Sequence, residues 1–294
     1  MAVFWKNGSL VEAEQATLSV FDHGLLYGDG IFEGLRFYNR VIFKTEEHLE
    51  RLWDSATAIG LEIPYSKEAL TSALYQCVDH FPEHDGYLRL VVTRGEGKLG
   101  IDPASCKNPS VFIIADHLAL VPDAIRSKGA EIIIASTRKL AADGLDPRVK
   151  SLNYLNHIMA RMEANRANAD EAVLLNAQGK VTEGSADNIF IYRDRTLKTP
   201  PVSDGALDGI TRQTILEIAS QLGVKTEETS LTAYDLYTAD ECFLTGTGAE
   251  LIPVTKIDGR TIGDGSFSCY QKLSDGFHRY IDDFNRSARV PMAG

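Results

Sequence analysis

Residues 146–155 read Asp-Pro-Arg-Val-Lys-Ser-Leu-Asn-Tyr-Leu, and they place a lysine, Lys150, where a short extended run passes into a helix. Apolar residues then recur at helical spacing from Leu152 and Leu155 onward. We expect a helix there with Ser151 as its N-cap. A lysine at such a junction can be desolvated, which lowers the pKa of an amine and makes it a Schiff-base nucleophile. The competing interpretation is an ordinary solvated lysine, because Lys is rarely buried.

The composition is that of an ordinary soluble globular chain. It has 294 residues, 44% of them hydrophobic and 24% charged, which is enough for one large or two medium domains. The net charge of −11 disfavours binding to a phosphate backbone, so no nucleic-acid partner is expected. No apolar run approaches the roughly 18 residues needed to span a membrane, and the N-terminus lacks a basic signal-peptide region. We expect a cytoplasmic protein without a membrane segment.

The cysteines support that compartment. Cys77, Cys106, Cys242 and Cys269 are widely separated and form no Cys-x-x-Cys pair. They suit reduced thiols rather than a disulfide framework, and no metal site is expected.

Strand and helix signals alternate irregularly along the N-terminal part of the chain. Asn7-Gly8 between apolar runs is a strong hairpin signal. Strands are expected at residues 31–37, 41–43, 87–93 and 111–115, with helices beginning at Thr45 and near Ser66.

Residues 116–129, which include Pro122, show weak periodicity and suggest a domain boundary. We expect a small N-terminal α/β domain at residues 1–118, a linker at 119–129 and a larger C-terminal domain at 130–294. In the latter, strands are expected at residues 130–136, 172–175, 180–182, 188–192, 196–199, 241–245 and 251–257, and a helix at 210–222. Strands outnumber helices and are often linked by hairpins. The predicted class is therefore α/β or α+β, in two domains with mixed, largely antiparallel sheets.

Three glycine-rich segments could bind phosphate. Residues 95–100 fit the dinucleotide pattern, but Pro103 follows where a helix should open, so a loop at the rim of a pocket is the better interpretation. Gly209-Ile210-Thr211 opens a helix, and Gly246-Thr247-Gly248-Ala249 follows a strand, so the amides of either segment could face an anion. For each segment taken alone, a structural cap or a tight turn is the more common interpretation.

Other residues would complete a pyridoxal phosphate site, which needs a Schiff-base lysine, a phosphate cradle and an acid for the pyridine nitrogen. Glu183, at a strand end, is the candidate acid, although a solvent-facing glutamate is common there. Tyr87 and Arg89 share one strand face, which suits a substrate carboxylate but also an exposed sheet face. Leu88, Leu90 and Val92 would form the core face.

The chain resembles the class IV, fold-type IV pyridoxal-phosphate aminotransferases, and within them the branched-chain amino acid aminotransferases. The segments that carry the resemblance, in order, are residues 22–36, 47–52, 150–155, 183–188, 209–212 and 245–250.

This resemblance implies a cofactor, pyridoxal 5'-phosphate, and a role for individual residues. Lys150 would be the catalytic Schiff-base lysine, Glu183 would partner the pyridine nitrogen, and Tyr154 would bond the ring hydroxyl. The remaining cofactor residues, at the phosphate, would be Arg51, Ile210, Thr211 and Thr247. The substrate pocket would be lined by Tyr27, Phe32, Gly34, Arg36, Tyr87, Arg89 and Gly248.

It also implies a reaction and an assembly. Amino groups of branched-chain L-amino acids would pass to 2-oxoglutarate in a ping-pong cycle, in a homodimer or higher homo-oligomer. A D-amino acid or (R)-amine transaminase, an aminodeoxychorismate lyase and a non-catalytic oligomeric protein of this fold stay open as alternatives. Gly97-Lys98-Leu99 stands where the D-amino acid enzymes tend to carry Arg-x-His, which speaks against the first of these.

Overall fold

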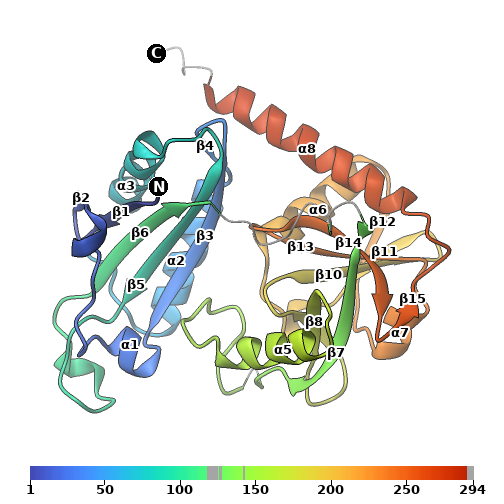
Figure 1. The fold of residues 1–294 in the computed structure, drawn as a ribbon, viewed down its shortest axis with the longest axis horizontal. Coiled ribbons are helices and arrows are strands. Elements are labelled where there is room, and N and C mark those ends of the chain that lie inside the picture. Colours follow the sequence, from blue (N-terminus) through green and yellow to red (C-terminus); the bar gives the residue numbers. More distant parts are fainter. Residues whose placement is uncertain (118–124, 126–127, 142, 290–294) are drawn as a thin grey trace. The chain divides into compact units, whose positions relative to one another are not determined.

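The computed structural model of the chain describes residues 1–117, 125, 128–141 and 143–289 (Figure 1). The chain divides into two compact units. The first unit comprises Met1–Leu118, Val149–Asn153 and Phe284–Gly294, and the second comprises Ala119–Arg148 and Tyr154–Asp283. Most of the linker predicted at residues 119–129 lies outside the described residues.

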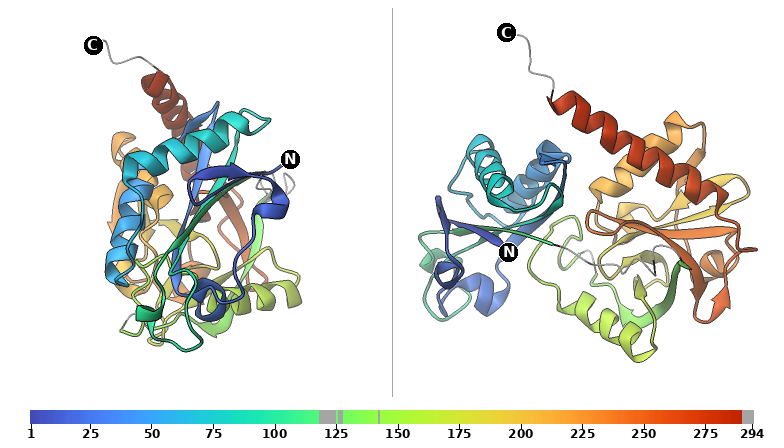
Figure 2. Two further views of the ribbon diagram at one scale, coloured as in Figure 1. Left: turned by 90° about the vertical axis from the view of Figure 1, so that its left-hand side faces the viewer. Right: turned by 45° about the horizontal axis from the view of Figure 1, so that its top comes forward.

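The first unit is built on a sheet with the strand order β2-β1-β6-β5-β3-β4, in which all neighbours are antiparallel. Its strands are β1 (Val3–Lys6), β2 (Ser9–Val11), β3 (Gly30–Tyr38), β4 (Val41–Ile42), β5 (Gly86–Thr93) and β6 (Ser110–Asp116). Its helices are α1 (His23–Tyr27), α2 (Thr45–Ala58) and α3 (Lys67–His80), with 3-10 turns at Ala13–Gln15 and Pro103–Ser105. Helices α2 and α3 pack against the sheet, as Figure 2 shows.

The sequence patterns of this unit are confirmed by its elements. Asn7 and Gly8 both have positive φ, 45° and 110°, as a two-residue hairpin turn requires, and β1 pairs with β2 across them. On β5 the side chains of Leu88, Leu90 and Val92 are fully buried against α2 and α3. Strand alternation therefore leaves Tyr87 and Arg89 on the other face.

The segment around Lys150 differs from the prediction. Helix α5 (Leu155–Arg166) begins three residues later than expected, with Tyr154 at its N-cap, so the assignment of Ser151 as N-cap is wrong. Instead, Ser151 forms a bridge to Ile31, and the backbone N–H of Leu152 donates to Gly30 O at 2.9 Å. This pairing with β3 places Val149–Asn153 in the first unit, whereas a division by sequence assigns it to the C-terminal domain.

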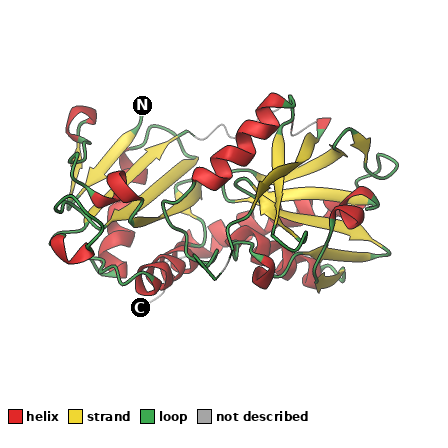
Figure 3. Cartoon of the chain, turned by 90° about the horizontal axis from the view of Figure 1, so that it is seen from below, coloured by secondary structure: helices red, strands yellow, loops and turns green. Residues whose placement is uncertain are grey.

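The second unit contains a mixed sheet with the order β12-β11-β10-β13-β14-β7-β8-β9, and β15 pairs with β14. Its strands are β7 (Ala130–Arg138), β8 (Glu171–Leu175), β9 (Val181–Gly184), β10 (Asn188–Arg193), β11 (Thr196–Thr199), β12 (Lys225–Glu228), β13 (Glu241–Gly246), β14 (Glu250–Ile257) and β15 (Arg260–Thr261). The pairs β11–β12, β14–β7 and β7–β8 are parallel, and the others are antiparallel. The predicted mixed α/β class, with largely antiparallel sheets, is confirmed (Figure 3).

The helices of this unit are α5, α6 (Ile210–Gln221), α7 (Ala233–Tyr237) and most of α8 (Ser268–Arg289), with a 3-10 turn at Val202–Asp204. Helix α8 was not predicted, although Leu273, Phe277 and Ile281 recur at helical spacing and are buried. A residue distant in sequence stabilises its start. The Glu241 carboxylate accepts from the N–H groups of Cys269 and Tyr270, at 2.9 and 2.8 Å. No helix in the described part of the chain has the length and apolar character needed to cross a membrane.

Candidate active site

Lys150 is held against the edge of β3 by its own backbone. Its carbonyl accepts from the N–H of Phe32 at 3.0 Å, and its N–H donates to Ser55 Oγ on α2 at 3.2 Å. Its ammonium nitrogen Nζ lies 4.8 Å from the centroid of the Phe32 ring, within cation–π distance. Backbone hydrogen bonds therefore fix the position from which the side chain extends, and its amine lies beside an aromatic face.

A buried triad of ionisable side chains, Glu33, His48 and Arg51, lies next to this segment. The Glu33 carboxylate accepts from Arg51 Nε at 2.7 Å, from Arg51 Nη2 at 2.8 Å and from His48 Nδ1 at 2.7 Å. Burial alone would raise the pKa of Glu33, but the Arg51 charge and these hydrogen bonds hold it well below its ordinary value. Glu33 is thus an ionised carboxylate that binds Arg51 in a bidentate manner.

Tyr87 and Arg89 do share a face, and Phe32 and Gly34 of the adjacent strand lie beside them. The Arg89 guanidinium is 4.5 Å from the Phe32 ring centroid and 5.5 Å from that of Tyr87. Gly34 pairs with Arg89 across the strands, and a Cβ at Gly34 would lie only 2.0 Å from the Tyr87 hydroxyl oxygen. Glycine at position 34 lets the Tyr87 ring cross the strand and form one aromatic and cationic surface with Phe32 and Arg89.

Burial raises the pKa of the Tyr87 hydroxyl, against the opposing effect of the Arg89 charge. Tyr87 is therefore a neutral hydroxyl at neutral pH. Arg36, two residues beyond Gly34 on the same face of β3, lies 5.4 Å from the Tyr38 ring centroid.

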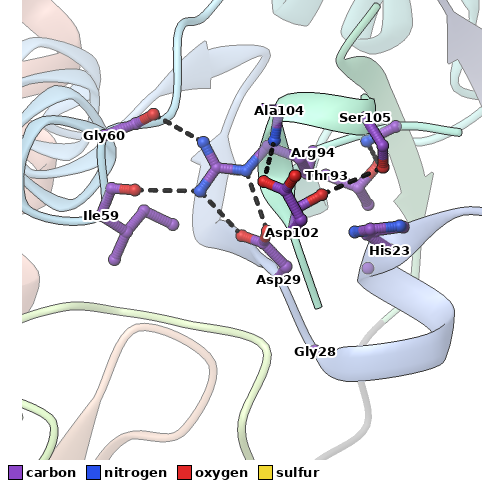
Figure 4. A network of polar contacts seen from close by, with 12 residues as sticks. His23, Gly28, Asp29, Ile59, Gly60, Thr93, Arg94, Asp102, Ala104 and Ser105 are labelled. Carbon is purple, nitrogen blue, oxygen red and sulfur yellow. Dashed lines mark hydrogen bonds and ion pairs between the residues drawn. The ribbon is translucent and has the colours of Figure 1, made fainter. Parts of the chain in front are cut away.

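Tyr27 lies at the end of α1, where a polar network fixes the neighbouring loops. Its hydroxyl accepts from the N–H of Gly100 at 2.8 Å, and its ring packs edge-on against His23. Arg94 holds the loop after α1 through two bonds to the Asp29 carboxylate and bonds to the carbonyls of Ile59 and Gly60 (Figure 4). No α-helix begins at the glycines of residues 95–100, and only the 3-10 turn at Pro103–Ser105 follows them. This segment is therefore a loop and lacks the helix that a dinucleotide-binding site requires.

In the second unit, Glu183 is the centre of a chain of polar contacts. It forms an ion pair with Lys139, and its Oε2 accepts from the N–H of Leu207 at 2.8 Å. Lys139 Nζ also lies 3.0 Å from His157 Nε2. Because an ammonium group only donates, Nε2 is the acceptor and His157 Nδ1 carries the proton that it donates to Ser185 O at 2.8 Å.

Tyr154 belongs to the same cluster. Its ring stacks on His157 with centroids 4.7 Å apart and an interplanar angle of 21°. Tyr154 and Glu183 are therefore connected through the Lys139–His157 contact, with both side chains fixed by stacking or hydrogen bonding.

The two predicted phosphate-binding turns meet at one strand of this unit. Asn188 pairs with Thr245, directly before the Gly246–Ala249 turn, and its side-chain amide donates to Leu207 O at 2.9 Å. A Cβ at Gly209 would lie 1.9 Å from Asn188 Oδ1, so Gly209 allows the start of α6 to approach this strand. Gly209 is the N-cap of α6 and offers no side chain, which leaves the amides of the first turn, at Ile210 and Thr211, to other acceptors.

Each unit thus gathers part of the predicted set. The first unit brings Lys150, Phe32, Gly34, Tyr87 and Arg89 together. It fixes Arg51 through Glu33, whose side chain lies on the opposite face of β3. The second unit brings together Glu183 and Tyr154, and it places the starts of the two turns, Gly209 and Thr245, beside Asn188.

Four members were missed by the sequence reasoning: Glu33, His48, Lys139 and His157. Only Glu33 left a usable signal, because strand alternation puts this acid on the fully buried face of β3 with Ile31 and Leu35. Among the described residues, no group of three or more His, Cys, Asp or Glu side chains is placed to hold a metal ion.

Comparison with known proteins assigns a family. The sequence model of the family described as Amino-transferase class IV matches residues 30–257. A Methanocaldococcus jannaschii protein, provisionally named a branched-chain-amino-acid aminotransferase, is 48% identical over 88% of each chain. A D-alanine aminotransferase from Bacillus licheniformis is 37% identical over 88% of this chain and 90% of its own.

Among solved structures, the T.th. branched-chain amino acid aminotransferase complexed with N-(5'-phosphopyridoxyl)-L-glutamate is similar, with a TM-score of 0.89 and 35% identity. The similarity covers 98% of this chain and 95% of that one.

Proposed function

Because the chain belongs to the class IV aminotransferase family, we propose that it transfers the amino group of branched-chain L-amino acids (Leu, Ile and Val) to 2-oxoglutarate, with pyridoxal 5'-phosphate as cofactor. The relative that is 48% identical is named for this activity. The similar solved structure holds a phosphopyridoxyl group joined to glutamate, which is the amino acid that corresponds to 2-oxoglutarate. The observation that carries the proposal is the position of Lys150, whose amine lies over the Phe32 ring while the next residue of the same strand, Glu33, binds Arg51.

The residues present fit this cofactor. The start of α6 provides backbone amides without a side-chain cap, and the buried hydroxyl of Thr245 has no hydrogen-bond partner among the described residues. Such donors, together with a guanidinium at Arg51, suit a phosphate group. When bound, pyridoxal phosphate supplies an aldehyde that takes up an amine and a ring that accepts electron density from the substrate.

Individual residues have separate tasks in this proposal. Lys150 would provide the amine that holds the cofactor aldehyde, and its free amine would move the substrate α-proton as general base and acid. Glu183 would keep a proton on the pyridine nitrogen of the cofactor, and the Tyr154 hydroxyl would form a hydrogen bond with the hydroxyl group of the cofactor ring. Arg51, the amides of Ile210 and Thr211, and Thr247 hold the phosphate.

The substrate residues must accept two kinds of side chain. Phe32 and Tyr87 provide aromatic faces for an aliphatic branch, and Arg89 or Arg36 provides a guanidinium for the second carboxylate of the acceptor. Gly34 leaves the space that Tyr87 occupies, and Tyr27 and Gly248 complete the proposed pocket. The two half-reactions then follow each other in a ping-pong cycle, in which a 2-oxo acid leaves before the second one binds.

We also propose a cytoplasmic homodimer or higher homo-oligomer. Helix α5 exposes Leu155, Ile158, Met159 and Met162, each by 46% or more, along one side at helical spacing. The α1 region exposes a second group, Val20, Phe21, Leu25 and Leu26. Exposed apolar groups of this kind are typical of subunit contacts. All four cysteines are free thiols, in keeping with a reducing compartment.

A D-amino acid transaminase is the second candidate, because the D-alanine aminotransferase is 37% identical. The absence of an Arg-x-His pair in the segment Gly97-Lys98-Leu99 argues against it. The test is the rate at which L-leucine, D-alanine and (R)-1-phenylethylamine each change the visible absorbance of the pyridoxal-phosphate-loaded protein. We expect L-leucine to react fastest, and faster reaction of D-alanine or the amine would assign the protein to the alternative.

A further inference from the structure

Glu33 and His48 form a buried polar pair that the proposed reaction does not use. Glu33 is 0% exposed and His48 is 1% exposed, although both side chains are ionisable. Glu33 lies on the core face of β3, and His48 and Arg51 lie one turn apart on α2, so all three side chains converge between strand and helix. Burying a carboxylate in this place is costly unless its partners compensate.

The partners take up both carboxylate oxygens. Arg51 donates from Nε to Oε1 and from Nη2 to Oε2, and His48 Nδ1 donates to Oε2 at 2.7 Å. Two parallel N–H···O bonds fix the plane and the rotation of a guanidinium group, which a single bond cannot do. The Nη1 edge of Arg51 is then directed away from Glu33.

We propose that Glu33 and His48 are positioning residues that orient Arg51 for a phosphate group. Glu33 fixes the guanidinium, and His48 fixes Glu33 by donating to the oxygen that also binds Nη2. This inference rests on the proposed function, in which Arg51 holds the cofactor phosphate.

The protonation of His48 agrees with that role. A carboxylate only accepts hydrogen bonds, so Nδ1 carries a proton, and Nε2 has no hydrogen-bond partner among the described residues. Burial lowers the pKa of His48, and the charges of Arg51 and Lys150 lower it further against the effect of Glu33. A neutral ring therefore holds Glu33 without adding a charge that would compete with Arg51 for it.

The test compares two ligands that differ only in the phosphate. Binding of pyridoxal phosphate and of pyridoxal to the full-length cofactor-depleted protein is measured by equilibrium dialysis, with folding checked by circular dichroism. We expect Arg51→Gln to weaken binding of pyridoxal phosphate and to leave binding of pyridoxal within about twofold. Glu33→Gln should weaken binding of pyridoxal phosphate by about 10- to 100-fold and leave binding of pyridoxal within about twofold, by analogy with the loss of a residue that supports a metal ligand.

His48 variants test the second step without removing the buried charge. Asn places an amide N–H where Nδ1 lies, so His48→Asn should bind pyridoxal phosphate nearly as the wild type does. His48→Leu, which cannot donate, should bind it about tenfold more weakly, with pyridoxal unaffected. If Glu33→Gln does not fold, this pair of variants decides the inference.

The matched control is Glu241→Gln, which makes the same chemical change in a buried glutamate that caps α8. It should leave the ratio of the two affinities unchanged. The inference is overturned if Arg51→Gln alters that ratio while Glu33→Gln and His48→Leu do not, or if these variants weaken both ligands equally. Failure of the wild-type protein to bind pyridoxal phosphate would instead overturn the proposed function.

Discussion

Lys139 and Glu183 form an ion pair in which the two side chains are only 8% and 7% exposed. The same unit contains a second Lys–Glu pair, Lys256 with Glu131 at 2.6 Å, whose side chains are 42% and 53% exposed. The two pairs have the same chemistry in different surroundings. Only the buried pair contains a residue proposed to contact the cofactor, Glu183. Lys139 is therefore the counter-ion of the carboxylate that would bind the pyridine nitrogen.

We expect Lys139→Met to lower the free energy of unfolding by about 3–5 kcal/mol, because it leaves a buried carboxylate without its counter-ion. Lys139→Arg should retain most of the stability. The double variant Lys139→Met/Glu183→Gln should recover part of the loss, since no uncompensated charge then remains. Urea unfolding of the four proteins measures these differences.

The exposed pair serves as the control for this experiment. Lys256→Met should cost about 1 kcal/mol or less, because solvent screens an exposed pair. Equal losses in Lys139→Met and Lys256→Met would show that burial of the Lys139–Glu183 pair has no energetic consequence.

Gly34→Ala tests the packing of the proposed substrate pocket. The added methyl would lie 2.0 Å from the Tyr87 hydroxyl oxygen, so the Tyr87 ring has to move from its place beside Arg89. We expect kcat/KM for L-leucine to fall by about 10- to 100-fold, as small misplacements near reacting groups commonly do. Gly144→Ala is the control, since a Cβ there would be 3.4 Å from its nearest neighbour, and it should keep wild-type kinetics. Wild-type kinetics for Gly34→Ala would remove Tyr87 from the pocket.

The stability of the protein should depend on pH through His48. Burial, with the charges of Arg51 and Lys150, lowers the pKa of His48 below its ordinary value of 6.5, and Glu33 opposes this shift. Between the lowered pKa and 6.5 the unfolded chain binds a proton that the folded chain does not, so stability is lost as the pH falls below 6.5. The slope reaches about 1.4 kcal/mol per pH unit.

His48→Asn removes this titration while keeping a donor to Glu33. The difference in unfolding free energy between the wild type and this variant should be constant above pH 6.5 and shift in favour of the variant below it. Urea unfolding across this range measures it. A difference that is independent of pH would contradict the assignment of a neutral, buried His48.

The elements with a local cause could be predicted from the sequence. The Asn7-Gly8 turn, the alternation along β5 and the start of α6 at Gly209 each follow from residues that are neighbours along the chain. What could not be predicted depends on distant residues. Ser151 is bound by β3 rather than by a helix, and the start of α8 is capped by Glu241 from β13, although the apolar spacing within α8 is itself a local signal.

The same distinction applies to the candidate site. Tyr87 and Arg89 share a face because of strand periodicity, so their pairing was visible in the sequence. The partners of Arg51 and Glu183 were not visible in the sequence. Glu33 is 18 residues away from Arg51 along the chain, and Lys139 is 44 residues away from Glu183. Periodicity identifies the face of an element, and packing decides which charges meet there.

The most direct test of the whole account is the site of covalent attachment of the cofactor. The protein is loaded with pyridoxal phosphate, reduced with borohydride, digested and mapped by mass spectrometry, with Lys150→Ala as the control. We predict a phosphopyridoxyl group on Lys150 in the wild type and none in the variant. Attachment to a different lysine, or equal labelling of Lys150→Ala, would contradict the central role given to Lys150.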